Sequence, residues 1–218
     1  MIFNKTILKQ STAFRRLVLL GTPAALAILE LFHPVAITGD VLADLGHRIP
    51  IWMTVHLLQL PLFGLMALAV YFLIDGVQSV AAIVSRIALW FFIVFYISFD
   101  TLAGISAGIV LDGALGKSPE VQREIVRLFE AFQFSPVALA INALGALGWV
   151  VSVVTAAYVV WKAGAPRFAS LCLLLSVIFA MHIPPTGPLG LTFFLIAAAR
   201  IESSQQRLMT RASIAPAG

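Results

Sequence analysis

Six long apolar segments, separated by short polar connections, set the strongest constraint on how this 218-residue chain can fold. They are Leu17–Phe32, Ile51–Ile74, Ile87–Leu111, Val137–Trp161, Phe168–Ile183 and Leu189–Ile201. A helix needs about 20 apolar residues to cross a hydrocarbon core of about 30 Å. The second, third and fourth segments reach that length, and Arg15 and Arg16 can extend the first by directing their charges to the surface. The sequence therefore predicts an all-α, polytopic transmembrane bundle with six spanning helices.

Composition supports a membrane protein and excludes several other classes. Hydrophobic residues make up 61% of the chain and charged residues 11%, against about 45–50% and about 25% in soluble domains. A single cysteine excludes a disulfide-stapled scaffold. The 14 basic residues are scattered without an aromatic stacking platform, so nucleic acid is not an expected partner. No glycine-rich loop leads to Gly-Lys-Ser/Thr, so nucleotide use is not expected either. The expected partners are membrane lipids.

The positions of lysine and arginine predict the orientation of the bundle. With a cytoplasmic N-terminus, ten of the 14 basic residues fall on the inner side, and the four on the outer side are Arg48, Lys117, Arg123 and Arg127. Cytoplasmic loops carry the excess of Lys and Arg, so both termini are predicted to be cytoplasmic in a plasma or bacterial inner membrane. We expect one bundle domain between two cytoplasmic tails, at residues 15–202, 1–14 and 203–218.

One polar connection has the pattern of a helix. Ser118, Pro119 and Glu120 are typical of an N-cap, a first helical position and a first-turn acid. Apolar residues then recur at helical spacing as far as Phe132, and charged residues occupy the opposite face. This pattern predicts an amphipathic helix over Pro119–Phe132. The helix would lie either in the outer membrane interface, where it could cover the bundle, or packed on its neighbours as a surface helix.

The connection between the last two apolar segments contains three prolines and a glycine. Pro184, Pro185, Gly187 and Pro188 break the helix, because proline cannot donate the helical hydrogen bond. The two flanking segments are short, so the turn is predicted to lie below the outer membrane surface. Non-helical backbone at that depth is tolerated where it is buried in protein or lines a water-filled cavity. We therefore expect a recess that opens to the outside.

Ionisable and amide side chains inside the segments gather at one predicted depth. Placing an Arg, Lys or Asp at the centre of a membrane helix costs about 2.5–3.5 kcal/mol on insertion scales, so such residues are candidates for function. With the orientation above, all of them lie in the outer half of the bundle or at its midplane. They are Glu30, His33, His56, Gln59, Asp100, Asn142 and His182.

Three histidines and two carboxylates favour a hydrolytic metal site. Zinc binds imidazole and carboxylate, and can leave one position for a water molecule. The predicted metal ligands are His33, His56, Asp100 and His182, and the predicted catalytic residues are Asp100 and Glu30. Gln59 and Asn142 would orient the ligands, whereas His47, beside Arg48, is expected to be a solvated loop residue. The expected function is hydrolysis of a lipid-like substrate with a divalent metal, most simply zinc.

Three other interpretations of the same residues stay open. His56 and His182 could be the cofactor-binding residues for a b-type haem, as its two axial ligands in an electron-transfer protein. The cluster could form a proton or solute pathway. It could also be a structural polar network in a subunit without catalytic activity.

Membrane metallohydrolases of the alkaline ceramidase and adiponectin receptor type also gather three histidines, an aspartate and a serine near one membrane face. This sequence is similar to them in that inventory. It lacks their paired histidines at four-residue spacing on a late helix, and its six segments are one fewer than their seven. The resemblance therefore does not transfer roles to individual residues.

Overall fold

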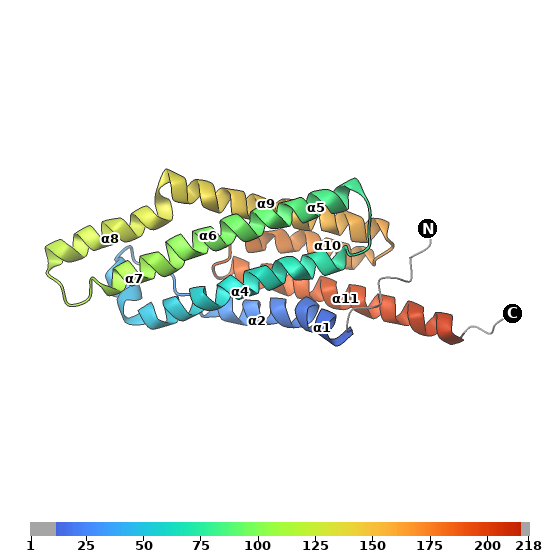
Figure 1. Cartoon of the computed structure of the whole chain (residues 1–218). Helices are drawn as coiled ribbons and strands as arrows, with labels where there is room; N and C mark the ends of the chain where they lie inside the picture. Colours follow the sequence, from blue (N-terminus) through green and yellow to red (C-terminus); the bar gives the residue numbers. More distant parts are fainter. Residues whose placement is uncertain (1–11, 215–218) are drawn as a thin grey trace.

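The computed structural model describes residues 12–214, the side chains of Thr12 and of residues 205–214 excepted, and this part of the chain contains helices and no strand (Figure 1). The α-helices are α1 (Thr12–Arg16), α2 (Thr22–Leu31), α3 (Val41–Leu45), α4 (Ile49–Leu73), α5 (Val80–Phe91), α6 (Ile97–Phe99), α7 (Ala107–Asp112), α8 (Pro119–Phe134), α9 (Pro136–Lys162), α10 (Arg167–Leu175) and α11 (Thr186–Ile214). The π-helical turns are η2 (Leu17–Gly21), η4 (Phe92–Tyr96) and η5 (Asp100–Ser106), and the 3₁₀ turns are η3 (Gly46–Arg48) and η6 (Ser176–Ala180).

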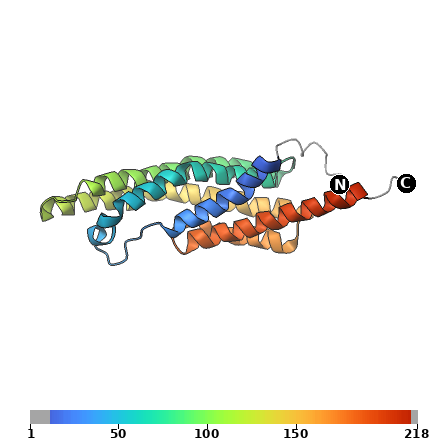
Figure 2. The same ribbon diagram turned by 90° about the horizontal axis from the view of Figure 1, so that it is seen from below.

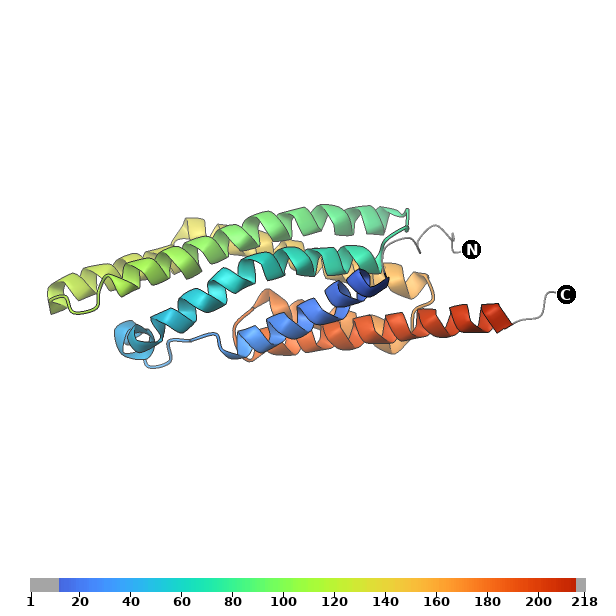
Figure 3. The same cartoon turned by 60° about the horizontal axis from the view of Figure 1, so that its bottom comes forward.

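In the described part of the chain, six antiparallel helical rods form a closed ring. The rods are α1–α2, α4, α5–α7, α9, α10 and α11, each with the π-helical or 3₁₀ turns that continue it. The α2 rod packs between α4 and α11, and α11 packs in turn against α10. The α9 rod contacts α10 on one side and α5 on the other, while α4 lies against η4 and η5 (Figures 2 and 3). Every rod therefore has two neighbours, and the centre of the ring is filled by one apolar core that includes Phe63, Trp149 and Phe194.

The surface of the ring has the polarity expected of a protein in lipid. Large apolar side chains such as Ile28, Trp90 and Leu147 are exposed. Polar side chains turn inward, and the buried Ser85 hydroxyl donates to the carbonyl oxygen of Ser152 at 2.8 Å, which joins α5 to α9. Three helical runs of the described residues are long and apolar enough to cross a membrane, namely Val41–Leu73, Val80–Asp112 and Pro119–Lys162. The all-α class is thus confirmed, and the three apolar runs are consistent with a membrane protein.

The prediction of six spanning helices is not supported. The first predicted segment, Leu17–Phe32, belongs to a helical run that begins at Thr12 and also carries Arg15, Arg16 and Glu30. The fifth corresponds to Arg167–Ala180, which is shorter than a span. The sixth is the apolar half of α11, which continues into a polar half. Three of the six predicted segments are therefore too charged or too short to cross a membrane on their own. Their helices nevertheless complete the ring.

The amphipathic helix predicted at Pro119–Phe132 exists as α8 (Pro119–Phe134). It runs lengthwise and antiparallel to α7, and leads into α9 through a break at Ser135 (Figure 1). Phe129 is buried against Trp52 in a second apolar cluster between α3, α4, α7 and α8. The charged face stays exposed, with Arg127 paired to Glu124 at 2.8 Å. Of the two predicted placements, the packed surface helix agrees with this arrangement.

The hairpin of α10 and α11 turns before it reaches the far end of the bundle. Its turn, at residues 181–185, lies part-way along the bundle, well short of the end formed by α3, α7 and α8 (Figures 1 and 2). The predicted break before α11 is thus confirmed. Because the hairpin ends early, its turn can direct a side chain into the interior of the bundle.

The opposite end of the bundle is tied by an ion pair between the first and last rods. Arg15 on α1 donates from Nη2 to Oε1 of Glu202 on α11 at 2.8 Å and from Nε at 3.2 Å. Both side chains are largely buried. The ends of the described chain therefore lie at the same end of the ring.

Candidate functional site

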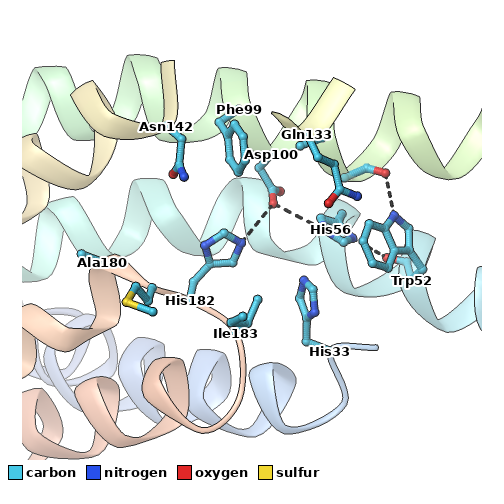
Figure 4. A pocket seen from close by; sticks show the side chains of 13 residues that line it. His33, Trp52, His56, Phe99, Asp100, Gln133, Asn142, Ala180, His182 and Ile183 are labelled. Atoms are coloured by element: carbon cyan, nitrogen blue, oxygen red, sulfur yellow. Dashed lines mark hydrogen bonds and ion pairs between the residues drawn. The ribbon is translucent and has the colours of Figure 1, made fainter. Parts of the chain in front are cut away.

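His33, His56, His182 and Asp100 surround one cavity of about 220 Å³ (Figure 4). His33 follows the end of α2, His56 lies in α4, Asp100 begins η5, and His182 lies in the turn before α11. All four side chains are buried. The structure thus brings together the four residues that the sequence predicted as metal ligands, from four separate elements.

The two nitrogens closest to the carboxylate belong to His56 and His182. Nε2 of His56 lies 3.8 Å from Oδ1 of Asp100, and Nε2 of His182 lies 4.0 Å from the same oxygen. The ring of His33 is centred 4.9 Å from that of His56 and 5.8 Å from that of His182. The three imidazoles and the carboxylate therefore form one contiguous cluster.

Two of the imidazoles have a fixed tautomer. Nδ1 of His33 lies 2.9 Å from the carbonyl oxygen of Pro34, and Nδ1 of His56 lies 2.7 Å from that of Trp52. A carbonyl oxygen can only accept, so Nδ1 must carry the proton in both rings. In the neutral ring, Nε2 then presents a lone pair.

Tyr96 places His182 in the same tautomer. The Tyr96 hydroxyl lies 2.9 Å from Nδ1 of His182, 3.1 Å from the carbonyl oxygen of Ala180 and 3.2 Å from that of Phe179. The two carbonyls accept the single hydroxyl proton, which leaves the hydroxyl oxygen to accept from Nδ1 of His182. All three histidines therefore direct an unprotonated Nε2 away from their anchors.

The interior of the cluster consists of acceptors. Both carboxylate oxygens of Asp100 and Nε2 of His33 are buried without a hydrogen-bond partner in the described part of the chain. A buried polar atom without a partner costs about 1–3 kcal/mol, and more when it is charged. The imidazole lone pairs and the carboxylate face one another without a hydrogen-bond donor between them, so they repel one another. The arrangement therefore favours a cation or protons at its centre.

The positions of the side chains are close to those of a metal site but more open. Among the described residues, no three His, Cys, Asp or Glu side chains enclose a metal ion as they stand. Two tetrahedral ligands about 2.0–2.1 Å from zinc lie about 3.3 Å apart. The distances of 3.8 and 4.0 Å from the two Nε2 atoms to Oδ1 of Asp100 exceed this ligand–ligand distance by about 0.5–0.7 Å. Binding of one ion by His56, His182 and Asp100 would therefore require these side chains to move closer by about that amount.

A glycine allows α4 to approach Asp100. Gly104 lies four residues after Asp100 in the π-helical turn η5, and a Cβ there would overlap the imidazole of His56. Trp52 Nε1 donates to the Gly104 carbonyl oxygen at 2.6 Å. The helix that the small residue at Gly104 admits is α4. Single π-helical turns within helices are frequent at functional sites.

Glu30 and Gln59 form a second, separate level. Neither residue lines the cavity, and both are fully buried. Gln59 Nε2 donates to Oε1 of Glu30 at 2.8 Å, which joins α4 to α2 one helical turn away from the contact of His56 with His33. Glu30 therefore has no direct contact with the cavity that would support its predicted catalytic role. The hydrogen bond between Glu30 and Gln59 is instead placed to fix the spacing of His33 and His56.

We expect Glu30→Gln to leave the unfolding temperature close to that of the wild type and Glu30→Ala to lower it. The glutamine keeps an oxygen that accepts from Gln59, whereas alanine leaves a buried amide unpaired, at a cost of about 1–3 kcal/mol. Thermal unfolding in detergent measures the difference. A Glu30→Gln protein as unstable as Glu30→Ala would show that the negative charge, rather than the hydrogen bond, matters at this position.

The remaining candidates divide between the cavity and the surface. His47 is exposed in η3, as predicted. Asn142 lines the cavity, as does Gln133, which the sequence analysis missed. It also missed Trp52 and Tyr96. Each precedes a candidate by four residues and so shares its helix face, which is the signal that could have identified them.

No protein-family model matches the chain, and no curated protein or solved structure is significantly similar to it. The geometry of the cavity is therefore the basis for a functional assignment.

Proposed function

We propose that this protein is a membrane hydrolase that holds a divalent metal, most simply zinc, on His33, His56, His182 and Asp100. The observation that carries the proposal is the convergence of two imidazoles, His56 and His182, on the buried carboxylate of Asp100, with the ring of His33 packed against both and all three rings anchored through Nδ1. Histidine ligands of metals are usually anchored through the second ring nitrogen in this way. Imidazole and carboxylate together suit zinc.

A bound divalent metal would act as a Lewis acid on a water molecule or a carbonyl group. The anchored imidazoles hold their Nε2 atoms in place, which lowers the cost of ordering them. Asp100 offers Oδ1 to the metal and keeps Oδ2 to accept a proton from water. In the hydrolysis, the hydroxyl of water joins the electrophilic atom of the substrate, and a proton passes to the leaving group.

A haem is a poorer fit to the same residues. Asp100 lies between His56 and His182, within 4.0 Å of both Nε2 atoms, where a porphyrin would have to lie. A structural network is disfavoured because it would leave the acceptors of Asp100 unpaired.

We place the protein in the cell membrane with the end that carries Arg15, Arg16, Arg86 and Lys162 in the cytoplasm, in accordance with the positive-inside rule. In this arrangement the other three rods enter the bilayer together with the three that are long and apolar enough to cross it. Both termini would be cytoplasmic, and the cavity would lie toward the outer surface.

The metal content of the purified protein tests the proposal. After exchange into metal-free buffer, elemental analysis is expected to find about one equivalent of zinc or iron per chain, without the Soret absorption of a haem. A well-folded preparation that neither retains nor takes up a divalent metal would refute it, and would favour the proton pathway or the structural network.

Tyr96→Phe is expected to weaken metal binding about 10–100-fold without abolishing it. The variant removes the hydroxyl that orients His182, and the loss of such a supporting partner usually has that effect. Titration with a competing chelator measures the affinity. Tyr158→Phe is the matched control, since Tyr158 is half-exposed on α9. Equal affinities of the two variants would contradict the positioning role of Tyr96.

A further inference from the structure

The wall of the cavity opposite His33 carries two side-chain amides. Gln133 near the end of α8 and Asn142 in α9 project toward the cavity from the side of Phe99 (Figure 4). Neither amide has a hydrogen-bond partner within the part of the chain that the structure describes. Each can donate two hydrogen bonds and accept two. These amides are therefore available to a molecule that enters the cavity.

The wall of the cavity offers a phosphate group no cationic side chain. Among the described residues that line it, Asp100 is the only acidic one, and there is no lysine or arginine. Arg, Lys and helix N-termini are the usual partners of phosphate in proteins. A phosphate headgroup would thus depend on the proposed metal ion alone, whereas an uncharged carbonyl group can accept hydrogen bonds from both amides.

The exposed part of the cavity lining is apolar. Met181 and Ile183, with 63% and 37% of their surfaces exposed, form part of the lining together with the half-buried Phe99. Val137 and Leu139, at the start of α9, are also exposed. In the proposed membrane position, such a surface is covered by acyl chains. The opening is thus suited to a ligand that arrives from the bilayer.

We infer that the substrate is a neutral acyl lipid, an ester or amide without phosphate, which enters from the bilayer beside Met181 and Ile183. Its carbonyl oxygen accepts hydrogen bonds from Asn142 and Gln133, and its acyl chain lies along Phe99. This inference rests on the metal site proposed above, since that site faces the amides across the cavity. Hydrolysis would break the acyl C–O or C–N bond, with the hydroxyl of water added to the acyl carbon and a proton to the leaving oxygen or nitrogen.

Photolabelling of the full chain in phosphatidylcholine nanodiscs tests the inference. The probe is a monoacylglycerol with a diazirine and an alkyne in its acyl chain, and the comparison is a lysophosphatidic acid with the same chain. We expect the neutral probe to label peptides containing Phe99 or Ile183 at least fivefold more than the phosphate probe. Asn142→Leu and the rim-blocking Ile183→Trp should each reduce this labelling at least fivefold. Leu147→Ala, on the lipid-facing side of α9, should not.

Equal labelling by the two probes, or full labelling of both Asn142→Leu and Ile183→Trp, would overturn the inference. Metal analysis of the same preparations separates it from the proposed function. Selective labelling of a protein without metal would support the lipid cavity and refute the hydrolase. A protein that holds metal but is not selectively labelled would refute the lipid substrate alone.

Discussion

Replacing His182 with alanine is expected to lower the metal content of the purified protein at least tenfold. The variant removes the ligand that the α10–α11 turn contributes, and it leaves Asp100 with only one imidazole nitrogen within 4.0 Å. The affinity of such sites depends on every ligand and on the partner that orients it. Elemental analysis of wild type and variant, purified side by side, measures the effect.

His47→Ala is the matched control for this measurement, because it removes an imidazole that is exposed in η3. Its metal content should equal that of the wild type. Circular dichroism and gel filtration establish that both variants are folded. If the folded His182→Ala protein retained a full equivalent of metal, the assignment of His182 as a ligand would be wrong.

Gly104→Ala is expected to destabilise the protein by about 1–3 kcal/mol, the usual cost of overpacking a buried contact, and to reduce metal binding at the same time. The new methyl group would overlap the imidazole of His56, which is held by Trp52 on the other side. The ring must then turn away from Asp100, or α4 must separate from η5. Thermal unfolding and metal content both report the change.

Gly64→Ala, in the same bundle, is expected to stabilise the protein instead. A Cβ at Gly64 in α4 would meet nothing within 4 Å, so the variant should gain about 0.5–1 kcal/mol from the better helix propensity of alanine. Stabilisation by both substitutions would contradict the close approach of His56 to Gly104.

The helical fold and much of the site could be predicted from the apolar segments and from the ionisable residues that lie within them. The fourth segment, predicted at Val137–Trp161, coincides with α9 (Pro136–Lys162) within one residue at each end. The number of spans could not be predicted, because an apolar segment shows where a helix can be buried but not whether it crosses a membrane unaided. Arg15, Glu30 and Glu202 are tolerated because neighbouring rods cover them.

The partners within the site were harder to predict than its members. Glu30 lies in the last turn of α2, whereas His33 lies beyond the end of that helix. Glu30 therefore lies beside Gln59 instead of in the cavity. Gln133 is on a different helix from every other candidate, and only tertiary packing of α8 brings it to the cavity.

The closure of the ring by α11 has a consequence for biosynthesis. The α11 rod packs against both α2 and α10, so the circle of helices is complete only after the ribosome has made the last hairpin. His182, the final member of the cluster, is delivered by that same hairpin. Nascent chains that end before it would carry His33, His56 and Asp100 without a finished chamber, and loading with the proposed metal would therefore follow the synthesis of this hairpin.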